Sequence, residues 1–144
     1  MAETCDLLNR CLYFTANSLG RVITRLAEES FRPTGLSPSH AFMLMTAAGS
    51  PGIGPGELAA KLSLAPSTVT RFADALVAKG LLTRTAEGRN ARLAATPAGL
   101  ALLKGIENSW KRLHKAYADV LGPGGDRLAA DIHAACRKLE GEAE

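Results

Sequence analysis

The chain has 144 residues, of which 47% are apolar, 22% charged and 5% aromatic, and its formal net charge is +3. This composition excludes disordered, fibrous and polycationic proteins and predicts one globular domain over residues 1–144. The N-terminus carries acids where a secretory signal needs Lys or Arg, and no apolar run approaches the roughly 18 residues of a membrane span. We therefore expect a cytoplasmic protein that contacts no membrane. Its three cysteines form no C-x-x-C pair, which predicts thiols and no structural disulfides.

Apolar residues at helical spacing predict a long first helix from about Glu3 to Phe31. Gly20 interrupts it, and either a bend or the close approach of a neighbouring helix would explain a glycine there. Pro33 ends this helix. Ser37 and Pro38 then form a helix start, because the serine hydroxyl can cap a first turn in which proline needs no N–H. This second helix is expected to run to about Ala48.

The same start signal recurs at Pro55, Pro66 and Pro97. It predicts a short helix over 55–62, a longer one over 66–79 and a long one over 97–121. A last helix is expected from about Asp126 to Leu139.

Residues 81–95 lose the helical period. The turn sequence over 86–90 separates two short segments, 81–85 and 91–95, which predicts a β-hairpin. The fold class is therefore mainly α, with one small hairpin.

The two helices between Gly54 and Gly80 have the layout of a helix-turn-helix. The second carries an apolar stripe on one face. Its opposite face bears short hydrogen-bonding side chains and one arginine, and these are Ser67, Thr68, Thr70, Arg71 and Asp74. Ser and Thr reach phosphates and base edges without bulk, and Arg can donate two hydrogen bonds to guanine. A merely solvated helix would more often carry Glu and Lys, so this pattern favours DNA.

The expected hairpin places Arg89 at its tip, with Arg84 and Arg92 on its strands. From Gly54 to Thr96 there are six basic and three acidic residues, which is a local basic footprint. A basic tip can reach a minor groove or a phosphate, although a solvated turn is the alternative explanation of Arg89. The candidate DNA-binding residues are Ser67, Thr68, Thr70, Arg71, Arg84, Arg89 and Arg92.

These segments, GELAAKL, STVTR, LVAKGLL, EGR and LAATPAG, resemble the MarR family of transcriptional regulators in sequence and order. The resemblance implies a winged helix-turn-helix over about 53–98, with dimerisation helices over about 3–31 and 100–140. It also implies a homodimer that binds a pseudo-palindromic operator as a repressor and is released by a small ligand or by oxidation. The family's usual Asp-x-Arg in the wing is replaced here by Glu87-Gly88-Arg89.

Other candidate sites carry less specific signals. Cys11, with Tyr13 close by, resembles the reactive cysteine of organic-peroxide sensors in this family, and a small buried hydrophobe is the alternative. Tyr13, Phe14 and Phe42 are candidates for an effector pocket, and core packing is their alternative. The three histidines have no local partners at metal-ligand spacing, so we expect no metal and no cofactor. The loop over 50–56 lacks the spacing of a phosphate-binding motif.

An enzyme is the weaker hypothesis, because no paired carboxylates or Ser/His/Asp order can be assembled. The sequence predicts a DNA-binding regulator. The alternative is a winged-helix module that binds only protein.

Overall fold

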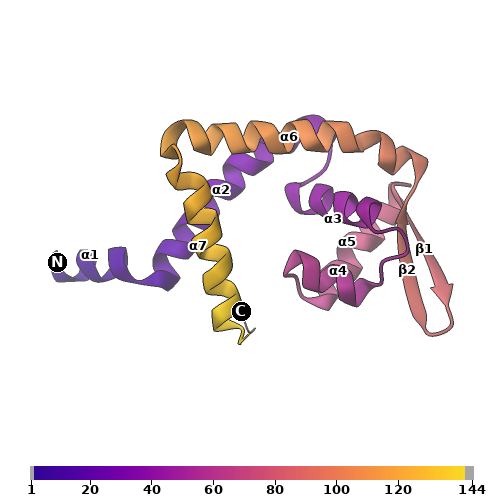
Figure 1. Cartoon of the computed structure of the whole chain (residues 1–144), viewed down its shortest axis with the longest axis horizontal. Coiled ribbons are helices and arrows are strands. Elements are labelled where there is room, and N and C mark those ends of the chain that lie inside the picture. The colour runs from indigo at the N-terminus through magenta and orange to yellow at the C-terminus, as the bar shows by residue number, and fades with distance from the viewer. Residues whose placement is uncertain (1, 142–144) are drawn as a thin grey trace. The chain divides into compact units, whose positions relative to one another are not determined.

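The computed structural model describes residues 2–141, except for the side chains of Ala2, Glu3 and Cys5. Within these residues the fold is mainly helical and contains one two-stranded antiparallel sheet (Figure 1). The elements are α1 (Ala2–Arg10), α2 (Leu12–Phe31), the 3₁₀ helix η1 (Arg32–Thr34), α3 (Pro38–Gly49), α4 (Pro55–Leu62), α5 (Pro66–Ala78), β1 (Leu82–Glu87), β2 (Asn90–Ala95), α6 (Pro97–Leu121) and α7 (Gly124–Leu139). The chain forms two compact units, Met1–Trp110 and Lys111–Glu144.

The prediction of one continuous first helix is wrong, because the helix is interrupted at Cys11. Cys11 is extended, with φ −82° and ψ 116°, and it is the N-cap of α2. Its N–H bonds to the Leu8 carbonyl over 3.2 Å, so a tight turn separates α1 from α2. No proline or glycine marks this break, and the apolar period continues across it, which explains why the sequence pattern does not reveal it.

The four proline-initiated helices are confirmed, since Pro38, Pro55, Pro66 and Pro97 are each a first helical residue. At α3 the Ser37 hydroxyl accepts a hydrogen bond from the His40 N–H over 3.2 Å. Ala65 offers α5 no side-chain cap. The residue before a proline is restricted to extended backbone, which gives Ala65 the conformation of an N-cap without a capping side chain.

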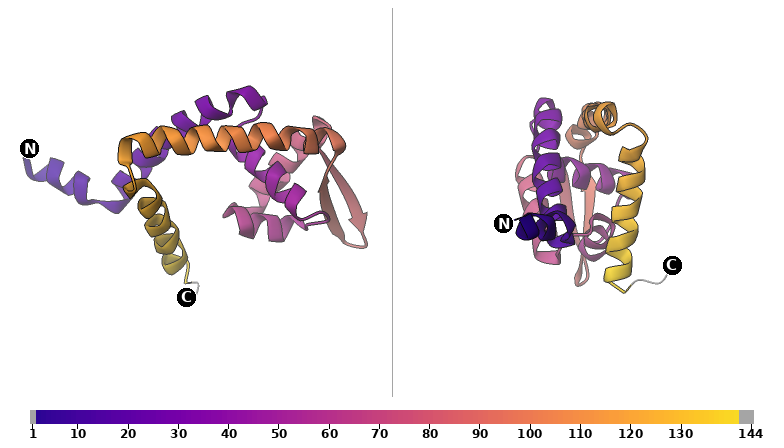
Figure 2. Two further views of the ribbon diagram at one scale, coloured as in Figure 1. Left: turned by 45° about the horizontal axis from the view of Figure 1, so that its top comes forward. Right: turned by 90° about the vertical axis from the view of Figure 1, so that its left-hand side faces the viewer.

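The hairpin is longer than expected and its turn is shorter. Leu82 pairs with Ala95 at one end and Glu87 with Asn90 at the other, which leaves Gly88 and Arg89 as the turn. Gly88 has φ +62°, a conformation that glycine adopts at no steric cost. Figure 1 and Figure 2 show the hairpin extending away from α3, α4 and α5.

A short bridge attaches the hairpin to the loop before α4. Ile53 and Leu93 pair as an isolated antiparallel bridge, and the Leu93 N–H donates to the Ile53 carbonyl over 2.9 Å. Both side chains are buried. They join a core that includes Phe31, Met43, Leu44, Leu58, Val69, Leu76, Leu82 and Ile106. The loop before α4 is therefore attached to β2 by both backbone hydrogen bonding and core packing.

A second junction connects the end of α5 with the start of α6. The Thr96 hydroxyl donates to the Gly80 carbonyl over 2.6 Å and accepts from the Gly99 N–H over 3.0 Å. The Thr96 N–H donates to the Leu81 carbonyl over 3.0 Å. The hairpin thus begins and ends at one point.

In the second unit, α7 begins two residues before the expected start. The His114 ring is 2.9 Å from an Asp126 carboxylate oxygen, and Tyr117 packs edge-on to that ring. Gly125 is buried against Tyr117. Among residues 2–141, no helix is long and apolar enough to cross a membrane.

The junction at Gly99 gives a stability prediction. A Cβ on Gly99 would lie 2.2 Å from the Leu81 carbonyl oxygen, so Gly99→Ala requires the backbone to shift. We expect it to lower the free energy of unfolding by about 1–3 kcal/mol, as overpacking does. Thermal and urea unfolding measure the change.

Gly105→Ala is the matched control for this prediction. It lies in the same helix, and its Cβ would meet no atom within 4 Å. Replacing a helical glycine in open space by alanine should raise stability by up to about 1 kcal/mol. Equal effects of the two substitutions would contradict the role of the junction.

Candidate nucleic-acid interface

The predicted recognition helix is α5, and it has one buried and one exposed face. Val69, Ala73 and Leu76 are buried, as the apolar stripe predicted. Ser67, Thr70 and Arg71 are exposed and Thr68 is half-buried. The Thr70 hydroxyl donates to the Pro66 carbonyl over 3.1 Å, so it retains lone pairs for a further partner. A surface of hydroxyls beside one guanidinium suits contact with base edges and phosphates.

Charge pairing within residues 54–96 divides the basic residues into two groups. Each of the three acids pairs with one base: Glu57 with Lys61, Asp74 with Arg84, and Glu87 with Arg92. The Arg84–Asp74 pair is the shortest, at 2.6 Å between Nη1 and Oδ1, and it joins the hairpin to α5. All three pairs are exposed and individually weak.

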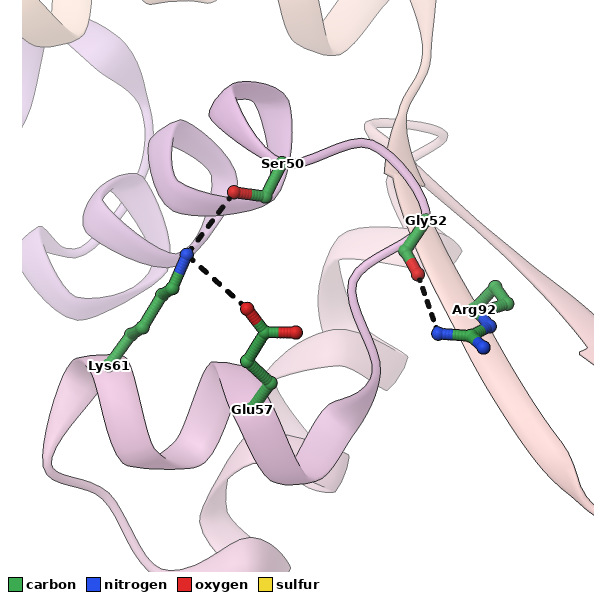
Figure 3. Close-up of polar contacts among 5 residues, drawn as sticks. All are labelled: Ser50, Gly52, Glu57, Lys61 and Arg92. Carbon is green, nitrogen blue, oxygen red and sulfur yellow. Dashed lines mark hydrogen bonds and ion pairs between the residues drawn. The ribbon is translucent and has the colours of Figure 1, made fainter.

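Two of the paired bases, Lys61 and Arg92, also hold the loop between α3 and α4, as Figure 3 shows. Lys61 Nζ lies 3.3 Å from the Ser50 hydroxyl and 3.5 Å from Glu57 Oε1. Arg92 donates to the Gly52 carbonyl over 3.3 Å and to Glu87 over 3.0 Å. Side-chain hydrogen bonds therefore attach the loop over 50–56 to α4 and to the hairpin.

The remaining three bases of this segment have no carboxylate partner within the described part of the chain. They are Arg71 on α5, Lys79 at the C-cap of α5 and Arg89 at the hairpin turn. Because their charges are not offset by a neighbouring carboxylate, these three carry the local positive potential. Lys79 was not among the predicted DNA-binding residues. A lysine at the C-terminal end of a helix is common, because its positive charge interacts favourably with the helix dipole.

A second feature missed by the sequence analysis lies beside Arg71. The His40 ring of α3 packs edge-on to Phe72, with 4.5 Å between centroids and an interplanar angle of 71°. The Arg71 guanidinium carbon lies 5.6 Å from the centroid of the same Phe72 ring. Burial, and then the charges of Lys79 and Arg71, lower the pKa of His40 below its ordinary value. Phe72 is half-buried, so it lies at the border between the buried and the exposed face of α5.

A cavity of about 490 Å³ lies between the start of α4 and the hairpin, with Glu57, Arg89 and Arg92 in its lining. Arg89 is thus an exposed residue that also lines this cavity. The structure brings Arg89 and Arg92 together there, whereas Arg84 is held at the Asp74 side chain of α5.

The candidate effector residues fall into different surroundings. Tyr13 and Phe14 are exposed on α2, with 80% and 38% of their surface accessible. Phe42 packs against Phe31, with ring centroids 5.2 Å apart, and lines a cavity of about 310 Å³ between α3 and α4 together with Lys61. Cys11 is a half-buried free thiol at the N-cap of α2.

Cys136, the other thiol of known exposure, is exposed on α7, and the Cys5 side chain lies outside the described residues. Among the residues that the structure describes, no group of three or more His, Cys, Asp or Glu side chains could hold a metal ion.

Comparison with known proteins gives a family match and a shared fold. The family model of MarR matches residues 36–93, which span α3, α4, α5 and most of the hairpin. No curated protein matches the sequence significantly.

Solved structures match nearly the whole chain. CouR from Rhodococcus jostii RHA1, bound to p-coumaroyl-CoA, has 23% identity and a TM-score of 0.74 over 92% of this chain and 93% of its own. The regulator MOSR from M. tuberculosis, in complex with DNA, has 23% identity and a TM-score of 0.76 over 90% and 98%. A probable transcriptional regulator from Pseudomonas aeruginosa has 17% identity and a TM-score of 0.80 over 90% and 98%.

At these identities the neighbours establish the fold, a winged helix-turn-helix with additional helices on both sides of it. The family match falls on the segment that carries the exposed face of α5 and the basic hairpin. Residues 36–93 thus match the MarR family of transcriptional regulators, and the fold is shared with solved structures of that family.

Proposed function

We propose that this chain is a homodimeric repressor that binds a pseudo-palindromic operator, with α5 in the major groove and the hairpin on the adjacent minor groove or phosphates. The observation that carries the proposal is the exposed face of α5, where Arg71 stands without a carboxylate partner among hydroxyl side chains. The contacts proposed for Ser67, Thr68, Thr70 and Arg71 are to base edges and neighbouring phosphates. Arg84, Arg89 and Arg92 would contact the backbone or the minor groove.

Exposed apolar side chains support the homodimer. Large apolar residues are exposed on α1 and the first turns of α2, and again from the end of α6 through α7. Val120 and Leu139 expose 82% and 77% of their surface. Apolar area of this extent on helices outside the helix-turn-helix is typical of a subunit interface.

Release from DNA is proposed to follow binding of a small ligand or oxidation. The structural neighbour CouR is described as bound to p-coumaroyl-CoA, which supports a small-molecule effector for this chain. Cys11 supports oxidation, because it is a free, half-buried thiol at the N-cap of α2, and thiols can be oxidised to a sulfenic acid.

The first prediction separates base reading from phosphate contact. Duplexes that the wild type enriches from a random pool serve as the specific probe, and a scrambled duplex as the non-specific one. Arg71→Ala should weaken specific binding by about 1–3 kcal/mol and relax sequence preference. Arg89→Ala should weaken binding to both duplexes and reduce the salt dependence by about one counterion.

Lys104→Ala, outside residues 54–96, is the control and should change neither property. Equal losses on both duplexes for Arg71→Ala and Arg89→Ala would show that α5 is misassigned. Failure to enrich or bind any duplex would favour the protein-only interaction module.

The second prediction tests the dimer. Ile132 on α7 is exposed and apolar, so Ile132→Glu would place a charge in the proposed interface. We expect light scattering to report a dimer for the wild type and a monomer for Ile132→Glu, with operator affinity lost by at least about tenfold. Met45→Glu, at an exposed apolar position of α3, should remain dimeric. A monomeric wild type at micromolar concentration would refute the proposal.

The third prediction separates oxidation from ligand binding as the release signal. Cumene hydroperoxide should oxidise Cys11 to a sulfenic acid and lower operator affinity, and Cys11→Ser should be insensitive. Operator affinity and mass spectrometry of the thiols give the readout. Retained affinity with unmodified Cys11 would exclude redox control and leave a small-molecule effector.

A further inference from the structure

Arg71 lies beside an aromatic contact, between Phe72 and His40, that is not part of the buried core. Phe72 lies on α5 between the buried stripe and the exposed face, and part of its ring is therefore accessible to surface groups. One of its neighbours is the His40 ring from α3 and another is the Arg71 guanidinium. This set of three side chains, His40, Phe72 and Arg71, is called the aromatic clamp below.

We propose that the aromatic clamp fixes the direction of Arg71, so that His40 and Phe72 are positioning residues for base recognition by that arginine. The inference rests on the proposed function and deepens it, because it assigns sequence discrimination to two residues that need not touch DNA.

The geometry carries the argument in two steps. A guanidinium 5.6 Å from an aromatic centroid is within the range of a cation–π attraction, which restricts the rotamers of an otherwise mobile side chain. The Phe72 ring is in turn held by the edge-on His40 ring at 4.5 Å, a favourable aromatic arrangement. His40 itself is fixed on the first turn of α3, where its N–H donates to the Ser37 hydroxyl.

Fixing Arg71 matters because it has no carboxylate partner in the described residues that could orient it. Arg84, by contrast, is oriented by Asp74 over 2.6 Å. An arginine that recognises guanine must present two donors at once. A side chain that samples several rotamers would lose conformational entropy on binding and would discriminate less between bases.

The clamp also couples base recognition to pH. The charged groups that face His40 are Arg71 on α5 and Lys79 at the C-cap of α5, and α3 carries no Asp, Glu, Lys or Arg. These cations and burial lower the pKa of His40 in the free protein. DNA phosphates attract the imidazolium and raise that pKa again, so binding takes up a proton and affinity should rise as the pH falls from about 8 to about 6.

The test uses the full chain and the duplex enriched by the wild type, together with single base-pair variants of that duplex and a scrambled one. Phe72→Leu keeps an apolar side chain but removes the ring, and Phe72→Tyr restores the ring. We expect Phe72→Leu and His40→Ala to lose about five- to tenfold of the discrimination at the base pairs to which Arg71→Ala is sensitive. Binding to the scrambled duplex should change less than about twofold, and Phe72→Tyr should retain discrimination.

The double variant Arg71→Ala with Phe72→Leu decides between positioning and general structural support. If Phe72 acts through Arg71, the double variant discriminates no worse than Arg71→Ala alone. Losses that add, or an equal loss on every duplex, would overturn the proposal.

Titration gives the second readout. His40→Gln should flatten the pH dependence of specific binding, whereas His133→Gln, at an exposed position of α7, should leave it unchanged. An unaltered slope in His40→Gln would refute the coupling to pH. Failure of the wild type to bind any duplex would overturn the proposed function and this inference together, but binding with intact discrimination in Phe72→Leu overturns the inference alone.

Discussion

The junction of Gly80 and Leu81 with Thr96 and Gly99 is the constraint on which the winged helix-turn-helix depends. Two consecutive carbonyls just after α5 accept hydrogen bonds from one threonine, and the next helix starts against the same backbone at a glycine. The hairpin between these points must leave and return to one place, so its direction relative to α5 is fixed by backbone contacts.

Ionic interactions add a second level of organisation to this backbone frame. Three acids pair with three bases and thereby attach the hairpin to α5, hold the loop before α4, and brace the hairpin strands. Within residues 54–96, the pairing leaves Arg71, Lys79 and Arg89 as the cations that have no carboxylate partner among the described residues. Net charge, which is small for the whole protein, is thus a poor guide to where DNA would bind, and the distribution of pairs is a better one.

Most of the fold could be predicted because its signals are local. Proline at a first helical position, apolar spacing and Gly-containing turns gave five helices and the hairpin to within a few residues. The break at Cys11 could not be predicted, since a single extended residue leaves the apolar period almost unchanged. The exposed residues of α5 also followed from periodicity, but the contacts of His40 with Phe72, and of Arg84 with Asp74, depend on which elements pack together. Such long-range pairings have no signature in one sequence.

The exposed ion pairs bear directly on how Arg84 and Arg92 would meet DNA. A pair such as Arg84–Asp74, with both side chains substantially accessible, contributes no more than about 1 kcal/mol. A phosphate carries a full charge and releases counterions when it is neutralised, so it can displace the carboxylate at small cost. Arg92 would keep its bond to the Gly52 carbonyl during such an exchange, because that bond uses Nη1 while Glu87 accepts from Nε. The pairs therefore orient the arginines in the free protein without removing them from the set of groups available to the DNA backbone.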